Sequence, residues 1–237
     1  MHTEIIRSED RGSFDHGWLK TYHTFSFADY YDPKRVNFGT LRVLNDDFVE
    51  PHNGFGMHPH QNMEIITIPL YGSLEHEDSM GSKGIIVSGE VQVMSAGSGI
   101  VHSEKNPADE PVNLLQIWIF SNKKNVSPRY DQKKFDENAW IDKFQLLVSP
   151  DGRNDSLWIH QDAFLSRIKC STGGSINYAA YHEDNGIFLF VLEGSAEIEG
   201  QKLNHRDSIS ITDETNIKIQ PKAGSEYLII EVPMMHD

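Results

Sequence analysis

Short apolar or alternating runs, separated by glycine, proline, asparagine, aspartate and serine, recur along the whole chain. Examples are F-G-T-L-R-V-L, M-E-I-I-T-I-P-L, N-L-L-Q-I-W-I-F and Y-L-I-I-E-V. Alternation with a period of two predicts strands, and many short strands between turn residues predict a sandwich or a barrel. One short helix is expected over residues 136–143 (D-E-N-A-W-I-D-K), with Asp136 as its N-cap. The pattern therefore predicts an all-β fold with few short helices.

Two stretches of the chain resemble each other. The first, I-I-T-I-P-L-Y-G-S-L-E-H-E, begins at Ile65, and the second, I-F-L-F-V-L-E-G-S-A-E-I-E, begins at Ile187. Each contains an apolar run, a G-S corner, and a run with acidic residues at alternate positions. Two copies of one β-unit explain this similarity. The polar, irregular segment 121–152 is then expected to connect the two copies.

Composition narrows the range of functions. The formal net charge is -14 and no block of lysine or arginine occurs, which argues against direct binding to nucleic acid or to an anionic membrane. Cys170 is the single cysteine, so an intrachain disulfide is excluded. The first residues lack the apolar segment of a signal peptide, and no run approaches the roughly 18 apolar residues of a spanning helix. We therefore expect a cytoplasmic protein.

Two short histidine-containing segments carry the candidate chemistry. The first, M-H-P-H-Q-N-M-E, contains His58, His60 and Glu64, and the second, S-A-G-S-G-I-V-H-S-E-K-N, contains His102 and Glu104. Side chains two positions apart on a strand point to the same face. H-x-H and H-x-E on neighbouring strands would therefore aim three imidazoles and at least one carboxylate at a common point. This is the donor set of a divalent transition-metal site.

The second half of the chain contains no H-x-H pair. Its histidines are scattered and stand at His160, His182, His205 and His236. We therefore expect that only the first of the two β-units holds a metal ion.

The two histidine segments are similar to the motifs of the cupin superfamily, which read H-x-H-x(3,4)-E and, further along, G-x2-H-x3-N. The matching positions are His58, His60, Glu64, Gly99, His102 and Asn106. The sequence departs from the full pattern at four points: His52 stands in place of the opening glycine, Gly72 closes the first motif one residue late, Ser95 stands in place of a proline, and Gly97 shifts the glycine spacing of the second motif. These departures indicate a branch of the superfamily.

Longer strings identify that branch. They are D-R-G-S-F-D-H-G-W-L-K-T-Y-H-T-F-S-F-A-D-Y-Y-D-P, V-Q-V-M-S-A-G-S-G-I-V-H-S-E and S-P-R-Y-D-Q-K-K-F. The chain resembles the pirin family over nearly its whole length, and in particular the bacterial pirin-like quercetin 2,3-dioxygenases. The resemblance implies a bicupin, that is, two cupin-type antiparallel β-barrels. We expect a metal-binding domain at 1–125, followed at 126–237 by a linker and a metal-free cupin domain.

The residues alone leave Glu64 and Glu104 open as the carboxylate ligand. The resemblance implies that the ligands are His58, His60, His102 and Glu104. Glu64 is then either a carboxylate behind them that orients an imidazole or a carboxylate of the pocket. It also implies one divalent ion, Fe(II) above the others. Copper, manganese, cobalt, nickel or zinc would suit the same imidazole and carboxylate donors.

The function that this resemblance implies is dioxygenation of a flavonol such as quercetin, in which the heterocyclic ring opens and carbon monoxide leaves. Glu104 is the first candidate for the base that takes the substrate's proton, and Glu64 is the second. One alternative is a regulatory or redox-sensing protein that binds a protein partner, and another is a non-oxidative cupin enzyme. We expect a monomer that takes a flavonol-like small molecule and dioxygen.

Expectations for the pocket are less specific. Phe38, Phe55 and Met57 are candidates for an apolar lining. The aromatic segment 16–31 is expected to pack over the first sheet, with a position at the mouth of the barrel as the alternative. His76 is open between a pocket position and a solvated strand position, and Trp118 is expected in the core.

Overall fold

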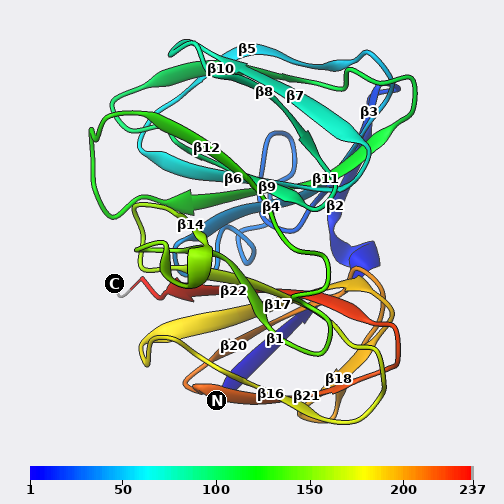
Figure 1. Cartoon of the computed structure of the whole chain (residues 1–237). Helices are drawn as coiled ribbons and strands as arrows, with labels where there is room; N and C mark the ends of the chain where they lie inside the picture. The colour runs from blue at the N-terminus through cyan, green and yellow to red at the C-terminus, as the bar shows by residue number, and fades with distance from the viewer. Residues whose placement is uncertain (236–237) are drawn as a thin grey trace.

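The computed structural model describes residues 1–235, so His236, one of the scattered histidines, lies outside the described residues. Figure 1 shows two β-barrels stacked on each other, the upper one built largely from cyan and green strands and the lower one largely from yellow to red strands. Each barrel combines a seven-stranded sheet with a four-stranded sheet. The all-β, two-barrel architecture is confirmed. Within residues 1–235, no helix has the length and apolar character needed to cross a membrane.

The first barrel has strands in the orders β12-β9-β6-β11-β4-β3-β2 and β5-β10-β7-β8, and all pairings in it are antiparallel. In chain order, its strands are β2 (Gly12–Asp15), β3 (Leu19–His23), β4 (Leu41–Val49), β5 (Gly54–His60), β6 (Met63–Tyr71), β7 (Ser73–Asp78), β8 (Lys83–Val87), β9 (Glu90–Ser95), β10 (Ile100–Lys105), β11 (Val112–Phe120) and β12 (Arg129–Lys134).

The second barrel has the orders β1-β20-β17-β22-β15-β13-β14 and β16-β21-β18-β19, in which only the short β13–β14 pair is parallel. In chain order, its strands are β1 (His2–Ile6), β13 (Gln145–Ser149), β14 (Leu157–Trp158), β15 (Phe164–Lys169), β16 (Ile176–Ala179), β17 (Asn185–Glu193), β18 (Ala196–Ile198), β19 (Gln201–Leu203), β20 (Ser208–Thr212), β21 (Asn216–Pro221) and β22 (Glu226–Pro233). Two single 3₁₀ turns complete the described elements, η1 (Ser8–Asp10) and η2 (Arg153–Asp155).

The internal repeat predicted from the sequence is confirmed by the strands. β6 and β7 turn at Gly72 (φ 79°), and β17 and β18 turn at Gly194 (φ 78°). A left-handed φ of this size favours glycine, which explains why both copies carry the G-S corner. Each copy thus places a long strand in a seven-stranded sheet and the following strand in a four-stranded sheet.

Two strands join a barrel from across the predicted division at residue 125. β1, the first strand of the chain, pairs with β20 in the second barrel, and Figure 1 draws it in blue among the later strands. β12 pairs with β9 in the first barrel. The division into 1–125 and 126–237 stays a prediction, and strand pairing crosses it twice. The connection expected at 121–152 is only partly irregular, because it contains β12 and β13.

The helix expected over 136–143 is not formed. Asp136 does accept a hydrogen bond from the backbone N–H of Asn138 (2.9 Å), but residues 137–140 form turns. The backbone of this segment forms two turn hydrogen bonds within itself, Ala139 N–H to Asp136 O (3.2 Å) and Ile141 N–H to Asn138 O (3.4 Å), and then bonds to Lys169 at the end of β15 through Trp140 O (2.9 Å) and Asp142 N (2.8 Å). Asp142 also has a left-handed φ of 55°, which a helix interior does not tolerate.

Alternation along β6 and β11 directs two kinds of side chain to opposite faces of the sheet. Ile66, Ile68, Leu115 and Ile117 join a core that lies between the barrels, where they meet side chains such as Phe188 from the second barrel. The intervening positions face the interior of the first barrel. The long apolar strands are therefore buried on both faces, and polar residues on the inner face require a partner or a ligand.

Candidate metal centre

Strands β5 and β10 bring the candidate ligands together. The two strands pair antiparallel with His102 opposite His58 and Ile100 opposite His60. Since side chains alternate, His58 and His60 lie on the same face of β5 and meet His102 across the pair. The ring centroids are 4.8 Å apart for His58 and His60, 4.4 Å for His58 and His102, and 4.9 Å for His60 and His102. One nitrogen from each ring lies within 4.8 Å of the others, so the three can hold one ion.

A hydrogen bond fixes the tautomer of His58. Its Nδ1 lies 2.8 Å from the carbonyl oxygen of Gly56. A carbonyl only accepts, so Nδ1 carries the hydrogen and the lone pair of Nε2 stays free for a metal ion.

A chain of side chains fixes the tautomer of His102. Nε2 of His76 lies 3.1 Å from the Asp78 carboxylate, and Nδ1 of His76 lies 3.4 Å from Nδ1 of His102. The carboxylate takes the hydrogen on His76 Nε2, which makes His76 Nδ1 the acceptor for the Nδ1 hydrogen of His102. The lone pair of His102 is then on Nε2, an atom that is buried and has no hydrogen-bond partner within residues 1–235. An orphaned imidazole nitrogen beside two other imidazoles fits a metal ion.

His76 is therefore a supporting residue rather than a solvated one. Its side chain is fully buried, like that of Asp78, and its ring stacks on Tyr130 at 4.5 Å. His76 also lies close enough to His102 and Glu104 to form a second three-residue cluster. However, both of its ring nitrogens are directed at protein partners. We expect it to orient His102 instead of ligating.

Glu104 lies two residues after His102 and is buried, with 2% of its surface exposed. Its Oε2 accepts a hydrogen bond from Nε2 of Gln116 (2.8 Å), and its Oε1 accepts one from the hydroxyl of Thr67 (3.3 Å). The register of the β10–β5 pair shifts here, because the two steps from His102 to Glu104 on β10 correspond to three steps from His58 to Phe55 on β5, so β5 bulges at the site. Both donors come from the inner face of the large sheet.

Glu64 lies in a different environment. It is fully buried on β6, and its Oε2 accepts a hydrogen bond from the hydroxyl of Ser95 at 2.6 Å. It belongs to neither of the two clusters that could hold a metal ion, and its other oxygen, Oε1, has no hydrogen-bond partner within residues 1–235, so no imidazole of that part bonds to it. The expectation that it orients an imidazole is therefore wrong. Ser95, which replaces the proline of the cupin motif, supplies its partner.

Burial sets the protonation states at the site. It lowers the pKa of His60 to about 4 and that of His102 to about 2, with nearby imidazoles adding to the effect. Both rings are therefore neutral at pH 7 and able to ligate. Burial raises the pKa of Glu104 to about 7, against the lowering effect of the hydrogen bond from Thr67. A cation bound at the three imidazoles would favour the ionised carboxylate.

A pocket of about 280 Å³ opens beside the cluster. Its lining residues come from the N-terminal segment, from β4, β5, β10 and β11, and are His16, Leu19, Thr21, His23, Phe27, Ala28, Asn45, Asp47, Phe55, His58, Glu104, Gln116 and Trp118. The segment 16–31 is divided: His16, His23 and Phe27 line the pocket, as in the alternative expectation, whereas Phe25 packs on Phe188 in the core between the barrels. Trp118 lines the pocket too and is half-buried, whereas a core position was expected.

Two of the three residues expected to line the pocket are elsewhere. Met57 points outward on β5, with 58% of its surface exposed. Phe38 packs on Phe188 in the core between the barrels, at a centroid distance of 5.8 Å. Only Phe55 lines the pocket. Met57 immediately precedes His58 on β5 and faces the opposite side, whereas the bulge between Phe55 and His58 returns Phe55 to the pocket side. Phe38 lies outside β5 and packs between the barrels.

Sequence reasoning missed the polar residues of the pocket floor. Asn45 and Asp47 lie on the inner face of β4, and burial raises the pKa of Asp47 to about 7. Three buried polar atoms that line this pocket have no partner within residues 1–235, namely His23 Nδ1, Asn45 Oδ1 and Trp118 Nε1. Buried polar atoms are normally hydrogen-bonded, so these three are available to a ligand. The signal in the sequence was N-D-D inside an otherwise apolar strand.

The two barrels and the histidine cluster inside the first define a metal-binding protein of cupin type. A family model described as pirin matches residues 6–119, and a model described as a quercetinase C-terminal cupin domain matches residues 146–232. The chain is 43% identical to a protein of Escherichia coli (strain K12) named quercetin 2,3-dioxygenase, over 97% of this chain and 98% of the relative. The chain therefore belongs to the pirin family, which confirms the resemblance.

Solved structures agree with this assignment. The crystal structure of YhhW from Escherichia coli gives a TM-score of 0.94 at 42% identity and covers 100% of both chains. A structure of bacterial pirin YhhW from Escherichia coli in complex with nickel(II) gives a TM-score of 0.93 at 41% identity, over 99% of this chain and 100% of that chain. The histidine cluster of this chain has the geometry to hold a metal ion.

Proposed function

We propose that the chain is a metal-dependent dioxygenase that opens the heterocyclic ring of a flavonol such as quercetin with release of carbon monoxide. The observation that carries the proposal is the cluster of three imidazoles beside a pocket that is lined by one of them, His58, and by Glu104, and that contains orphaned polar atoms. The relative of Escherichia coli named quercetin 2,3-dioxygenase supports the same activity. We propose His58, His60, His102 and Glu104 as the ligands.

The pocket offers a flavonol both flat apolar walls and hydrogen-bonding atoms. Phe27, Phe55 and Trp118 line it, and Phe27 meets Trp118 edge to face at 5.3 Å. Aromatic walls of this kind hold a planar ring system and exclude water. His23 Nδ1 and Asn45 Oδ1 can bond the hydroxyl groups of such a substrate.

Proton transfer falls to Glu104 in this proposal. When bound, a divalent ion supplies Lewis acidity that lowers the pKa of the substrate's 3-hydroxyl group. Glu104 lines the pocket and its carboxylate accepts that proton, while Gln116 and Thr67 hold the carboxylate in place. Glu64 is the weaker candidate because it is not among the residues that line the pocket. The electron-rich substrate then reacts with dioxygen.

We propose iron(II) as the resident ion and a monomer as the active form. Three imidazoles and a carboxylate suit iron(II), and also copper, manganese, cobalt, nickel and zinc. Elemental analysis of the protein purified from its native host tests the first proposal, and light scattering tests the second. An ion other than iron would refute the proposed metal, and a stable dimer would refute the proposed monomer. Neither result would change the proposed ligands.

Turnover with quercetin in air tests the function. The metal-loaded protein should consume flavonol and release one carbon monoxide per flavonol, and His102→Ala should lose both metal and turnover. Glu64→Gln is the matched control, since it changes a buried carboxylate that is outside the cluster. Absence of carbon monoxide with iron, copper, manganese, cobalt and nickel would remove the proposal. A stoichiometric protein partner that binds only the oxidised metal form would favour the regulatory alternative.

A further inference from the structure

A second and larger cleft lies between the two barrels, with a volume of about 480 Å³. The cleft and the metal pocket lie on opposite faces of the large sheet of the first barrel. Ile68 and Leu115 line the cleft, whereas their neighbours along the strands, Thr67 and Gln116, face the metal site. The second barrel contributes Leu147, Leu192 and Leu228 to the same lining. The cleft thus has an apolar floor built by both barrels.

Arg167, on β15, lines this cleft as a buried cation, with only 8% of its surface exposed. Its Nε donates to Oε1 of Gln145 (2.8 Å), its guanidinium lies 4.7 Å from the ring centre of Trp140, and its Nη2 is buried without a partner. Burial lowers its pKa, while the charges of Glu137 and Glu226 act in the opposite direction. Neither carboxylate forms an ion pair with it within residues 1–235, and Glu226 is paired with Lys169 at 2.7 Å.

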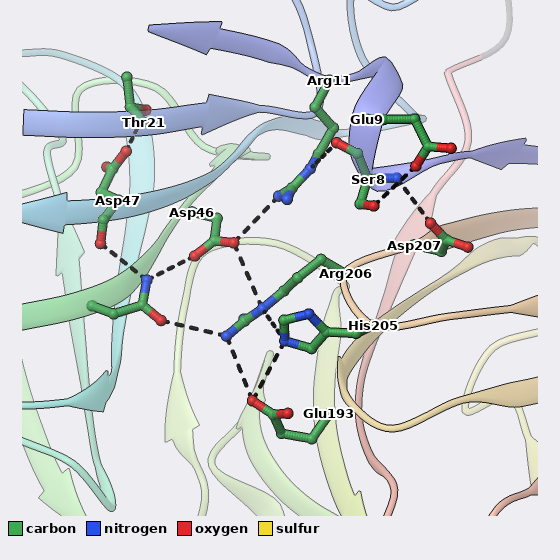
Figure 2. A network of polar contacts seen from close by, with 11 residues as sticks. Ser8, Glu9, Arg11, Thr21, Asp46, Asp47, Glu193, His205, Arg206 and Asp207 are labelled. Atoms are coloured by element: carbon green, nitrogen blue, oxygen red, sulfur yellow. Dashed lines mark hydrogen bonds and ion pairs between the residues drawn. The ribbon is translucent and has the colours of Figure 1, made fainter. Parts of the chain in front are cut away.

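Arg206 is a second buried cation in the lining, with 9% of its surface exposed and its Nη1 without a partner. Figure 2 shows its guanidinium between Asp46 and Glu193. These ion pairs are long, 3.7 Å from Nε to Asp46 and 3.9 Å from Nη2 to Glu193, and the same two nitrogens donate hydrogen bonds to His205 Nε2 (3.1 Å) and Asn113 Oδ1 (3.4 Å), so Nη1 is the nitrogen left free. Asp46 also faces Arg11 at 3.4 Å, so one carboxylate serves two guanidinium groups.

We propose that this cleft binds a small organic anion, a carboxylate with an apolar aromatic or aliphatic body. A buried cation without an ion pair, such as Arg167, is costly, and a carboxylate that bonds to a free guanidinium N–H group removes that cost. Arg167 and Arg206 supply such groups, and Trp140 and the leucines supply contact for the apolar body. The volume is within the range of about 300–1,000 Å³ that is usual for small-molecule sites. The site is separate from the metal centre.

Isothermal titration of the metal-loaded protein with 4-fluorobenzoate tests the proposal. We expect one bound equivalent, with binding weakened roughly tenfold or more in Arg167→Gln, because a charge-assisted hydrogen bond is lost. Arg153→Gln is the matched control, since Arg153 is half exposed and pairs with Asp151 outside the cleft. Uncharged 4-fluorobenzamide should bind at least tenfold more weakly than the carboxylate.

Two further arms keep the test decisive. His102→Ala should bind 4-fluorobenzoate as the wild type does, because the metal centre is not used. Ser88→Trp adds bulk at an exposed position of the lining and should block binding even if Arg167→Gln does not fold. The proposal fails if the wild type does not bind the probe at millimolar concentration. It also fails if Ser88→Trp binds normally, or if binding disappears in His102→Ala.

Discussion

The orientation of His102 by His76 leads to a sharp prediction. Replacing His76 with phenylalanine keeps an aromatic ring against Tyr130 but removes the acceptor of the Nδ1 hydrogen of His102. His102 can then place its hydrogen on Nε2. In that tautomer Nε2 has no lone pair to donate to a metal ion. The three-imidazole cluster therefore binds an ion less tightly in His76→Phe, although its proposed ligands are all present.

The structure sets the size of this effect. Loss of a partner that orients a metal ligand lowers metal affinity by about 10- to 100-fold. The Nδ1–Nδ1 distance of 3.4 Å is long for a hydrogen bond, so we expect the lower part of this range. An increase in Kd of about 10- to 30-fold corresponds to about 1.4–2 kcal/mol. The Asp78 carboxylate also loses its partner in the variant, so the free energy of unfolding should fall by about 1–3 kcal/mol.

Competition with a chromophoric chelator measures the Kd directly, and the spectrum of the cobalt(II)-loaded protein reports the coordination number. Tyr130→Phe is the control, because it keeps the ring that stacks on His76 and removes only a hydroxyl that bonds to Gln132. A Kd within twofold of the wild type would refute the orienting role. A loss above about 1,000-fold, together with a change in coordination number, would instead identify His76 as a ligand, as its cluster with His102 and Glu104 permits.

Three further predictions concern the same barrel. Glu104→Gln should raise the metal Kd by more than about 100-fold, which exceeds the effect of losing a supporting residue, and Glu64→Gln should leave the Kd within threefold. The reverse result would make Glu64 the ligand in place of Glu104. Metal at about 100 times its Kd should stabilise the protein by about 2.7 kcal/mol, so a chelator should lower Tm by roughly 5–10 °C in the wild type and not in His102→Ala, as measured by calorimetry. Burial raises the pKa of Asp47 from 3.8 to about 7, so the folded state holds a proton that the unfolded state loses, and stability falls as pH rises between these values. The free energy of unfolding of Asp47→Asn should therefore exceed that of the wild type at pH 8 by on the order of 4 kcal/mol and equal it at pH 3. Unfolding in urea at both pH values measures this difference, with the exposed Asp29→Asn as the control. No gain at pH 8 would show that the Asp47 carboxyl titrates normally.

The sequence predicted those parts of the structure that depend on local alternation. A period of two in the apolar runs is sufficient for strands, and the two G-S corners were sufficient for the repeat. The proximity of His58, His60 and His102 followed from the same period once the two motifs were placed on neighbouring strands. The helix at 136–143 was wrong because its backbone bonds to Lys169, a contact distant in sequence that local propensity does not contain.

The missed residues depend on three-dimensional neighbours. His76 is next to His102 only because β7 pairs with β10, where Glu104 is opposite His76. Likewise, segment 16–31 reaches the pocket because β3 pairs with β4 in the large sheet. Neither pairing is visible in the spacing of motifs. A polar pair such as Asn45 and Asp47 inside an apolar strand was the one local signal that could have been used.

A comparison of the two copies explains why the barrels differ inside. When the repeats are aligned at their G-S corners, Thr67 corresponds to Leu189 and His76 to Ile198, and all four side chains are fully buried. In the first barrel these positions support Glu104 and His102. In the second barrel they join an apolar cluster that fills the interior with residues from both of its sheets. A buried polar group needs a partner, so an apolar interior at the same positions offers no support for a metal ligand. The difference between the barrels is therefore built into the residues behind the ligands as well as into the ligands themselves.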